Sequence, residues 1–338
     1  MQLERFRFRA MGSPCELQLW ADDRQTAERV ADVATAEVAR LEQKYSRYRE
    51  DSLASRINRS AGSACGVIVD DETAALLDFT ATAHQESEGR FDPTSGVLRR
   101  IWDFHSGQLP SEKQIQKTLR LVGWSKIRWE RPHLSLPVVG MELDWGGFVK
   151  EYAADRVAEL CRSLGIRSGL IDLGGDLAVV GPHPDGSPWI AGIRNPRQPE
   201  QAMAQIALSG GGLATSGDYE RFMIVDGQRY SHLLDPRTGE SFRAGPASIS
   251  AKADHCLIAG VTTTIAMLHE ENECEAFLSR VGLPHLGVTR NGRLFGDTEH
   301  FAKPAQQEPV VAPTRPAPFP GAQLQDADGR PHATRSLP

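Results

Sequence analysis

The residues best suited to chemistry lie in residues 215–239, which read TSGDYERFMIVDGQRYSHLLDPRTG and carry hydroxyls, acids and one histidine. The runs RFMIV and RYSHLL flank Asp226-Gly227, a dipeptide typical of a tight hairpin turn. The second run ends at residues 235–239, where a proline and a glycine favour a rigid turn. We therefore expect His232 near the end of a strand, where its imidazole can be aimed at a ligand. A histidine with only a structural hydrogen bond fits the hairpin equally well.

A second group of hydroxyls lies in the segment DHCLIAGVTTTIAML, residues 254–268. The segment is apolar nearly all round, which predicts a buried helix. Positions 260, 263 and 264 share one helical face, and three oxygen-bearing side chains there would form part of a Mg²⁺ site. The residues present are Gly260, Thr263 and Thr264, which offer two hydroxyls and no carboxylate. Physical chemistry alone therefore favours threonines that bond back to the preceding helical turn.

Glycine pairs provide places where a phosphate could approach the backbone. Gly146-Gly147 leads directly into a helix, so the N-terminal amides of that helix are available to an anion. Lys150 follows in the first turn, where a cation opposes the helix dipole. That position suggests contact with an anion, although a solvated surface lysine is the commoner case. The glycine motifs match neither a Walker loop nor a dinucleotide-binding fingerprint.

Alternating helices and strands position these groups. The clearest helix begins near Phe148 and ends near Leu164, with Gly165 as its C-terminal cap. Its polar face carries Glu151, Asp155, Glu159 and Arg162. We expect further helices at about residues 27–45, 71–88, 111–122 and 273–281, and a short helix that ends at Asn58. We expect strands at 5–9 and 15–20, on either side of the turn LGGDL, through Gly192, Leu208 and Gly212, and two more after Val281.

Bulk properties exclude several classes of protein. The net charge of −6 over 338 residues leaves no electrostatic footprint for nucleic acid. Five widely spaced cysteines favour a reducing compartment over a disulfide framework. No apolar run reaches the ~20 residues of a membrane span, and the N-terminus has no apolar signal core. We expect a cytoplasmic protein with one domain over residues 1–303 and a disordered, proline-rich tail over 304–338.

Taken in order, these motifs resemble a known family. MGS at Met11, SRYREDSLASRIN, GRFDPTSGVLRRIW, LDWGGFVKEYAADR, LGGDL, TSGDYER and SHLLDPRTG occur in the order and spacing of the FAD:protein FMN transferases, the ApbE family. The resemblance covers roughly residues 5–297. It implies an α+β, two-lobed fold with mixed or antiparallel sheets flanked by helices and an FAD cleft between the lobes. It also implies Mg²⁺-dependent transfer of FMN from FAD to a serine or threonine of a partner protein, usually a redox subunit, with release of AMP.

The same resemblance assigns individual residues. His232 matches the base for the acceptor hydroxyl, a role that suits a neutral imidazole. Val149 matches a position that offers the metal its backbone carbonyl, and Thr263 and Thr264 stand at positions of the metal site. Arg90 stands where a small residue is common. The positions that the resemblance assigns to the FAD site are Met11, Tyr48, Phe91, Asp92, Gly146, Tyr152 and Leu234. We add Arg90 and Lys150 to this predicted site, Lys150 because of its place in the first turn of the helix.

The chain departs from the family in two ways. Gly260 stands where the family has a metal-binding aspartate, so the main carboxylate is missing; Asp254 and Asp176 are candidate substitutes. Family members are typically exported lipoproteins, whereas we expect no signal peptide here and therefore a cytoplasmic partner. Two alternatives to transfer stay open. The missing carboxylate favours an FAD-binding carrier or assembly factor with weakened catalysis; the other alternative is an FAD pyrophosphatase that releases FMN and AMP.

Overall fold

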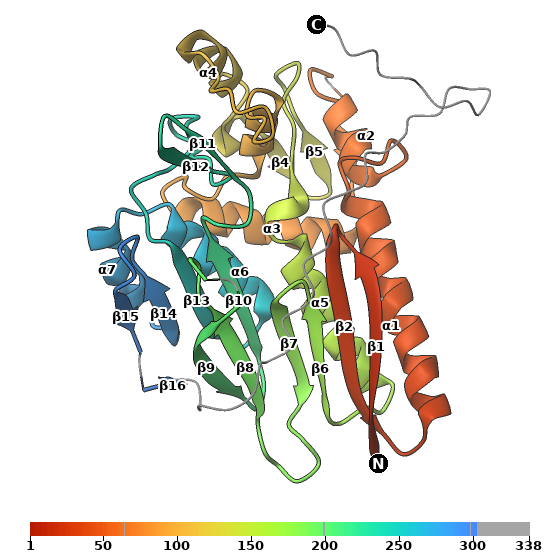
Figure 1. The fold of residues 1–338 in the computed structure, drawn as a ribbon. Coiled ribbons are helices and arrows are strands. Elements are labelled where there is room, and N and C mark those ends of the chain that lie inside the picture. The colour runs from red at the N-terminus through yellow and green to blue at the C-terminus, as the bar shows by residue number, and fades with distance from the viewer. Residues whose placement is uncertain (64, 199, 298, 303–338) are drawn as a thin grey trace, which may run out of the picture. The chain divides into compact units, whose positions relative to one another are not determined.

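A large antiparallel sheet forms the centre of the structure, a computed structural model that describes residues 1–302 except 64, 199 and 298 (Figure 1). Its strand order is β1-β2-β6-β7-β10-β13-β14-β15, and each strand pairs antiparallel with its neighbours. The strands are β1 (Gln2–Ala10), β2 (Ser13–Ala21), β6 (Gly169–Leu173), β7 (Asp176–Gly181), β10 (Gly212–Gly217), β13 (Ser248–Ala253), β14 (His285–Val288) and β15 (Leu294–Gly296).

Helices cover one face of this sheet and a second sheet covers the other. The helices are α1 (Arg24–Tyr45), α5 (Val149–Ser163) and α6 (Cys256–Met267). The second sheet has the order β16-β9-β8, with β8 (Trp189–Arg194), β9 (Ala202–Leu208) and β16 (Phe301–Ala302). Within β6, Ile171 packs into the core beneath the helices and Leu170 into the core shared with the second sheet. Because both faces are covered, the central strands are buried almost throughout.

A smaller core above the sheet holds the hairpin that carries His232. Leu98 and Trp102 pack with Ile115, Met223 and Leu234 in a cluster separate from the main core. The elements around it include η1 (Pro93–Arg100), α4 (Glu112–Leu119), β11 (Phe222–Val225) and β12 (Gln228–Ser231). The remaining elements are α2 (Leu53–Arg59), α3 (Asp71–Glu86), α7 (Glu271–Val281), η2 (Trp124–Lys126), η3 (Trp145–Gly147), β3 (Val67–Ile68), β4 (Arg128–Glu130) and β5 (His133–Ser135).

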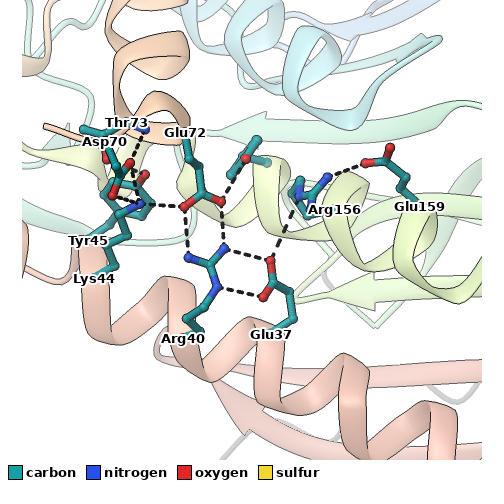
Figure 2. A network of polar contacts seen from close by, with 10 residues as sticks. Glu37, Arg40, Lys44, Tyr45, Asp70, Glu72, Thr73, Arg156 and Glu159 are labelled. Carbon is teal, nitrogen blue, oxygen red and sulfur yellow. Dashed lines mark hydrogen bonds and ion pairs between the residues drawn. The ribbon is translucent and has the colours of Figure 1, made fainter. Parts of the chain in front are cut away.

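A half-buried acid ties helix α5 to α1 and α3. Glu72, in the first turn of α3, accepts hydrogen bonds from Arg40 at 2.7 Å and Lys44 at 2.6 Å, both on α1 (Figure 2). The hydroxyl of Tyr152, on α5, donates to Glu72 at 3.1 Å. Burial alone would raise the pKa of Glu72, but Arg40 and Lys44 outweigh it and hold that pKa at about 2. The carboxylate therefore stays charged and fixes the helix that carries Lys150.

The expected α+β fold with antiparallel sheets and flanking helices is confirmed, with differences in detail. Strand β13, in the middle of the sheet, was not predicted, because SISAKA is short and rich in small residues. The strand that precedes His232 ends at Ser231, earlier than expected. Residues 1–302 lie within one unit, Met1–Ala305, and the predicted tail from 304 lies outside the described residues. In the described part of the chain, no helix is both long and apolar enough to cross a membrane.

Candidate active site

The hairpin predicted around Asp226-Gly227 is confirmed. Val225 pairs with Gln228, and both turn residues have positive φ, 50° for Asp226 and 73° for Gly227, as a type I′ turn requires. His232 follows β12 directly. Its backbone amide donates to the carbonyl of Arg221 at 2.9 Å, which continues the hairpin pairing by one residue. The strand and its turn therefore fix the backbone from which the imidazole projects.

The environment of His232 keeps its ring neutral. Nδ1 lies 3.3 Å from the Arg221 carbonyl oxygen, so a proton on Nδ1 forms a hydrogen bond and leaves Nε2 as the basic nitrogen. Burial, and then the positive charge of Arg99, lower the pKa of His232 to about 4. At pH 7 the ring is uncharged and can accept a proton.

The imidazole opens into a cavity of about 250 Å³ built from segments far apart in the sequence. Helices α5 and α6, strand β10, the β6–β7 turn and the start of η1 all contribute to its wall. Eight predicted site residues line it: Arg90, Phe91, Asp92, Gly146, Lys150, His232, Leu234 and Thr264. Other residues that line the cavity were not predicted as site residues from the sequence; they include Arg99, Asp144, Glu151, Ser216 and Glu220.

Five predicted residues do not line the cavity. Tyr48 is 77% exposed, and the hydroxyl of Tyr152 is engaged by Glu72. Met11 occupies the β1–β2 turn with φ of 50°. Val149 is buried in the core at the start of α5, and Thr263 is fully buried behind Ser216. Their roles in FAD or metal binding stay predictions.

Lys150 is paired with a buried acid rather than being a solvated lysine, although its own side chain is 28% exposed. Its Nζ lies 2.7 Å from a carboxylate oxygen of Asp176, whose side chain is 6% exposed. Asp176 opens β7 directly after Gly174 and Gly175, which both have positive φ and so allow the tight turn from β6. Burial raises the pKa of Asp176 in spite of the ammonium beside it. The sequence named Asp176 and Asp254 as substitute acids; Asp254 is exposed and does not line the cavity.

Helices α5 and α6 run against each other in a register set by Asp155. Its carboxylate accepts hydrogen bonds from the amides of Cys256 at 2.8 Å and Leu257 at 2.9 Å, which caps α6. Glu151 lies one turn before Asp155 on α5, and it faces Gly260, which lies one turn after Cys256 on α6. A Cβ atom on Gly260 would lie 2.6 Å from Cγ and 2.8 Å from Oε1 of Glu151. Glu151 and Asp155 lie on the predicted polar face of α5, and α6 packs against that face at these two residues.

One carboxylate oxygen of Glu151 is unsatisfied. Its Oε2 is buried and has no hydrogen-bond partner among the residues that the structure describes. Burial, and then the charge of Asp176, raise the pKa of Glu151 to about 8. A buried oxygen of this kind is costly unless a proton, a cation or a ligand satisfies it.

Hydroxyl groups gather beside Gly260. Thr263 donates to the Gly260 carbonyl at 2.9 Å, which confirms the predicted bond to the preceding turn. The Ser216 hydroxyl lies 2.9 Å from that of Thr263 and 3.4 Å from that of Thr264. These oxygens could serve as neutral ligands of a hard cation.

Other groups on the wall suit an anion. The Nε of Arg90 is buried and lacks a hydrogen-bond partner within the described residues. Phe148 precedes α5, and no described side chain caps that helix, so its first amides are free. Asp92 differs: its carboxylate accepts from the Thr94 amide and hydroxyl at 2.8 and 2.6 Å and from the Trp124 amide at 2.8 Å. Asp92 therefore shapes the wall rather than contacting a ligand through free oxygens.

A second cavity, of about 380 Å³, is lined by other residues of the hairpin, among them Arg229 and Ser231. Four arginines line it, Arg197, Arg229, Arg243 and Arg290, but none of the predicted site residues does. It has basic charge without a histidine or the buried carboxylate oxygen of Glu151. The groups that could do chemistry converge in the cavity beside His232, which we take as the candidate active site.

Comparison with known proteins identifies the family. The family model of ApbE matches residues 11–286. The chain belongs to the ApbE family. It is 30% identical over 287 residues to an FAD:protein FMN transferase of Klebsiella pneumoniae, covering 83% of this chain and 87% of that protein.

Two solved structures share the fold of this ApbE-family chain. The crystal structure of the ApbE protein of Thermotoga maritima is 27% identical, with a TM-score of 0.81 over 88% of this chain and 98% of that one. The apo flavinyl transferase ApbE of Pseudomonas stutzeri is 29% identical, with a TM-score of 0.77 over 89% and 94%. The similarity therefore extends over nearly the whole of both structures.

Proposed function

We propose that this protein transfers FMN from FAD to a serine or threonine hydroxyl of a partner redox protein and releases AMP. Membership of the ApbE family supports the reaction class. The observation that carries the proposal is the neutral imidazole of His232 in one cavity with Lys150, Arg90 and the uncapped start of α5. A proton acceptor thus lies in the same cavity as groups that bind phosphate.

Each group has a defined part in the reaction. The amides of α5, with Lys150 and Arg90, bind and orient the diphosphate of FAD. His232 takes the proton of the acceptor hydroxyl as its oxygen forms a bond to the phosphorus of the FMN half. The bond from that phosphorus to the bridging oxygen breaks, and AMP leaves with the bridging oxygen. The diphosphate is placed in this cavity because His232, Lys150 and Arg90 all line it.

Mg²⁺ fits the oxygen-rich corner next to Gly260. The orphaned Oε2 of Glu151 and the hydroxyl of Thr264 are ligands of the kind that Mg²⁺ prefers. Predicted additional ligands are the backbone carbonyl of Val149 and the hydroxyl of Thr263. When bound, the ion would offset the negative charge that develops on the phosphate oxygens. Among the described residues no three His, Cys, Asp or Glu side chains form a metal cluster, so hydroxyl and carbonyl oxygens must complete the coordination.

A product assay tests the proposal. The pure protein is incubated with FAD, Mg²⁺ and a recombinant redox protein as candidate acceptor. Nucleotides are separated by chromatography, and the acceptor is followed by in-gel flavin fluorescence. We expect AMP and fluorescent acceptor in equal amounts. AMP with free FMN and no labelled acceptor would identify an FAD pyrophosphatase, and intact bound FAD would identify a carrier; either result contradicts transfer. Residence in the cytoplasm remains a prediction.

A further inference from the structure

The space beside Gly260 is occupied by an acid from another helix. We infer that Glu151, on α5, supplies the carboxylate ligand of the divalent-cation site in place of the side chain that Gly260, on α6, lacks. The inference rests on the proposed function and adds to it a ligand from a different element. It also explains why a glycine at position 260 does not leave the site without a carboxylate.

Glu151 fills the space in which a side chain at position 260 would begin. Three atoms of Glu151, Cγ, Oε1 and Cδ, lie within 2.6–2.9 Å of the position that a Cβ on Gly260 would take. Such distances are too short for non-bonded carbon and oxygen atoms. A side chain at 260 and the present carboxyl of Glu151 therefore exclude each other, so the carboxyl of Glu151 stands where an acid at 260 would begin.

The register between helices α5 and α6 is fixed by hydrogen bonds. Asp155 holds the first amides of α6 at 2.8 and 2.9 Å, one helical turn from Glu151 along α5. Tyr152, next to Glu151, is tied to Glu72 on α3. With α5 held by contacts to both α6 and α3, Glu151 is directed at Gly260 by the backbone of a helix and not by a flexible loop.

The carboxylate of Glu151 has an oxygen whose hydrogen-bonding capacity is unsatisfied. Its Oε2 is shielded from solvent and lacks a hydrogen-bond partner within the described residues. Lys150, the neighbouring cation, is engaged by Asp176 at 2.7 Å. Thr264 lies on the same face of α6 as Gly260 and lines the cavity with Glu151, and the Ser216 hydroxyl is 3.4 Å from that of Thr264. One carboxylate and nearby hydroxyls form an oxygen donor set for a hard divalent cation.

The test exchanges the acid between helices in the full-length protein. Mn²⁺ is the probe, without FAD; its binding is measured from the electron paramagnetic resonance signal of free Mn²⁺ and from the rise in melting temperature that it causes. The variants are Glu151→Gln, Gly260→Asp and the double variant Glu151→Ala/Gly260→Asp. Asp254→Asn is the matched control, since Asp254 is an exposed acid at the start of α6 that does not line the cavity.

We expect Glu151→Gln to weaken Mn²⁺ binding at least ~10-fold and to abolish the rise in melting temperature. Gly260→Asp alone should melt at a lower temperature, because its Cβ collides with Glu151. The double variant should regain Mn²⁺ binding near the parental level, an effect that a purely structural role of Glu151 would not produce. Asp254→Asn should bind as the parent does.

The inference is overturned if the parent binds no Mn²⁺, or if Glu151→Gln binds it as tightly as the parent. Should Glu151→Gln fail to fold, the double variant decides: failure to bind Mn²⁺ in a folded protein refutes the exchange. Binding of FAD, followed by flavin fluorescence, and the product assay are measured on the same samples. A parent that binds Mn²⁺ through Glu151 but labels no acceptor would refute the proposed function and leave the ligand assignment intact.

Discussion

Replacement of His232 by alanine is expected to lower the rate of FMN transfer by about 100- to 10,000-fold, the usual effect of removing a general base. FAD should still bind, because the diphosphate contacts come from α5, Lys150 and Arg90. The rate is measured as AMP release with saturating acceptor, and FAD binding as a change in flavin fluorescence. His133→Ala, at an exposed histidine on β5, is the control and should react at the parental rate. Transfer by the His232 variant at the parental rate would remove the base from the mechanism.

The lowered pKa of His232 also predicts how the stability of the protein changes with pH. The ring has an ordinary pKa of 6.5 when unfolded and about 4 when folded. The unfolded chain therefore binds a proton first, and the contribution of His232 to stability is lost as the pH falls from about 6.5 to about 4. The His232→Ala protein should lose less stability over that interval than the parent, as measured by urea unfolding. An imidazole that titrates near 6.5 in the folded protein would contradict the buried, neutral base.

Replacement of Lys150 by methionine is expected to lower the free energy of unfolding by about 3 kcal/mol at pH 7. The substitution keeps the apolar length of the side chain but leaves Asp176 buried without its counter-ion at 2.7 Å. Asp176 then gains stability by taking up a proton, so its folded pKa rises further above its unfolded value. Stability should therefore recover at low pH and fall as the pH rises. Urea unfolding at pH 5 and pH 7 measures both effects.

The double variant Lys150→Met/Asp176→Asn controls for the loss of packing. With both charges removed, most of the stability at pH 7 should return, because no unpaired charge remains buried. A Lys150→Met protein as stable as the parent would mean that Lys150 is a solvated lysine after all. A double variant no more stable than the single one would assign the loss to packing instead of charge.

Local signals in the sequence predicted the elements that carry the site. The Asp226-Gly227 turn sets the hairpin before His232 because only residues tolerant of positive φ fit there. The helix after Gly146-Gly147 was predicted by its apolar periodicity, and it begins at Val149. Strand β13 was not predicted, because its small residues form a strand only when they are buried between β10 and β14.

Contacts between distant segments could not be predicted in the same way. Glu151 and Gly260 meet because α5 packs against α6. The hydrogen bond that joins the two helices, from the Cys256 amide to Asp155, spans more than 100 positions in the sequence. The periodicity of α5 placed Glu151 and Asp155 on a polar face, as their charge suggests, but it could not tell that another helix covers that face. Likewise, the pairing of Lys150 with Asp176 depends on how β7 lies beside α5.

A structure of the protein with FAD bound tests the central claim most directly. The account predicts the diphosphate in the cavity between His232 and the first turn of α5, with Nε2 of His232 facing the phosphorus of the FMN half and Lys150 and Arg90 in contact with the phosphate oxygens. FAD in the arginine-lined cavity beside Arg197, or a His232 ring turned away from the diphosphate, would contradict it.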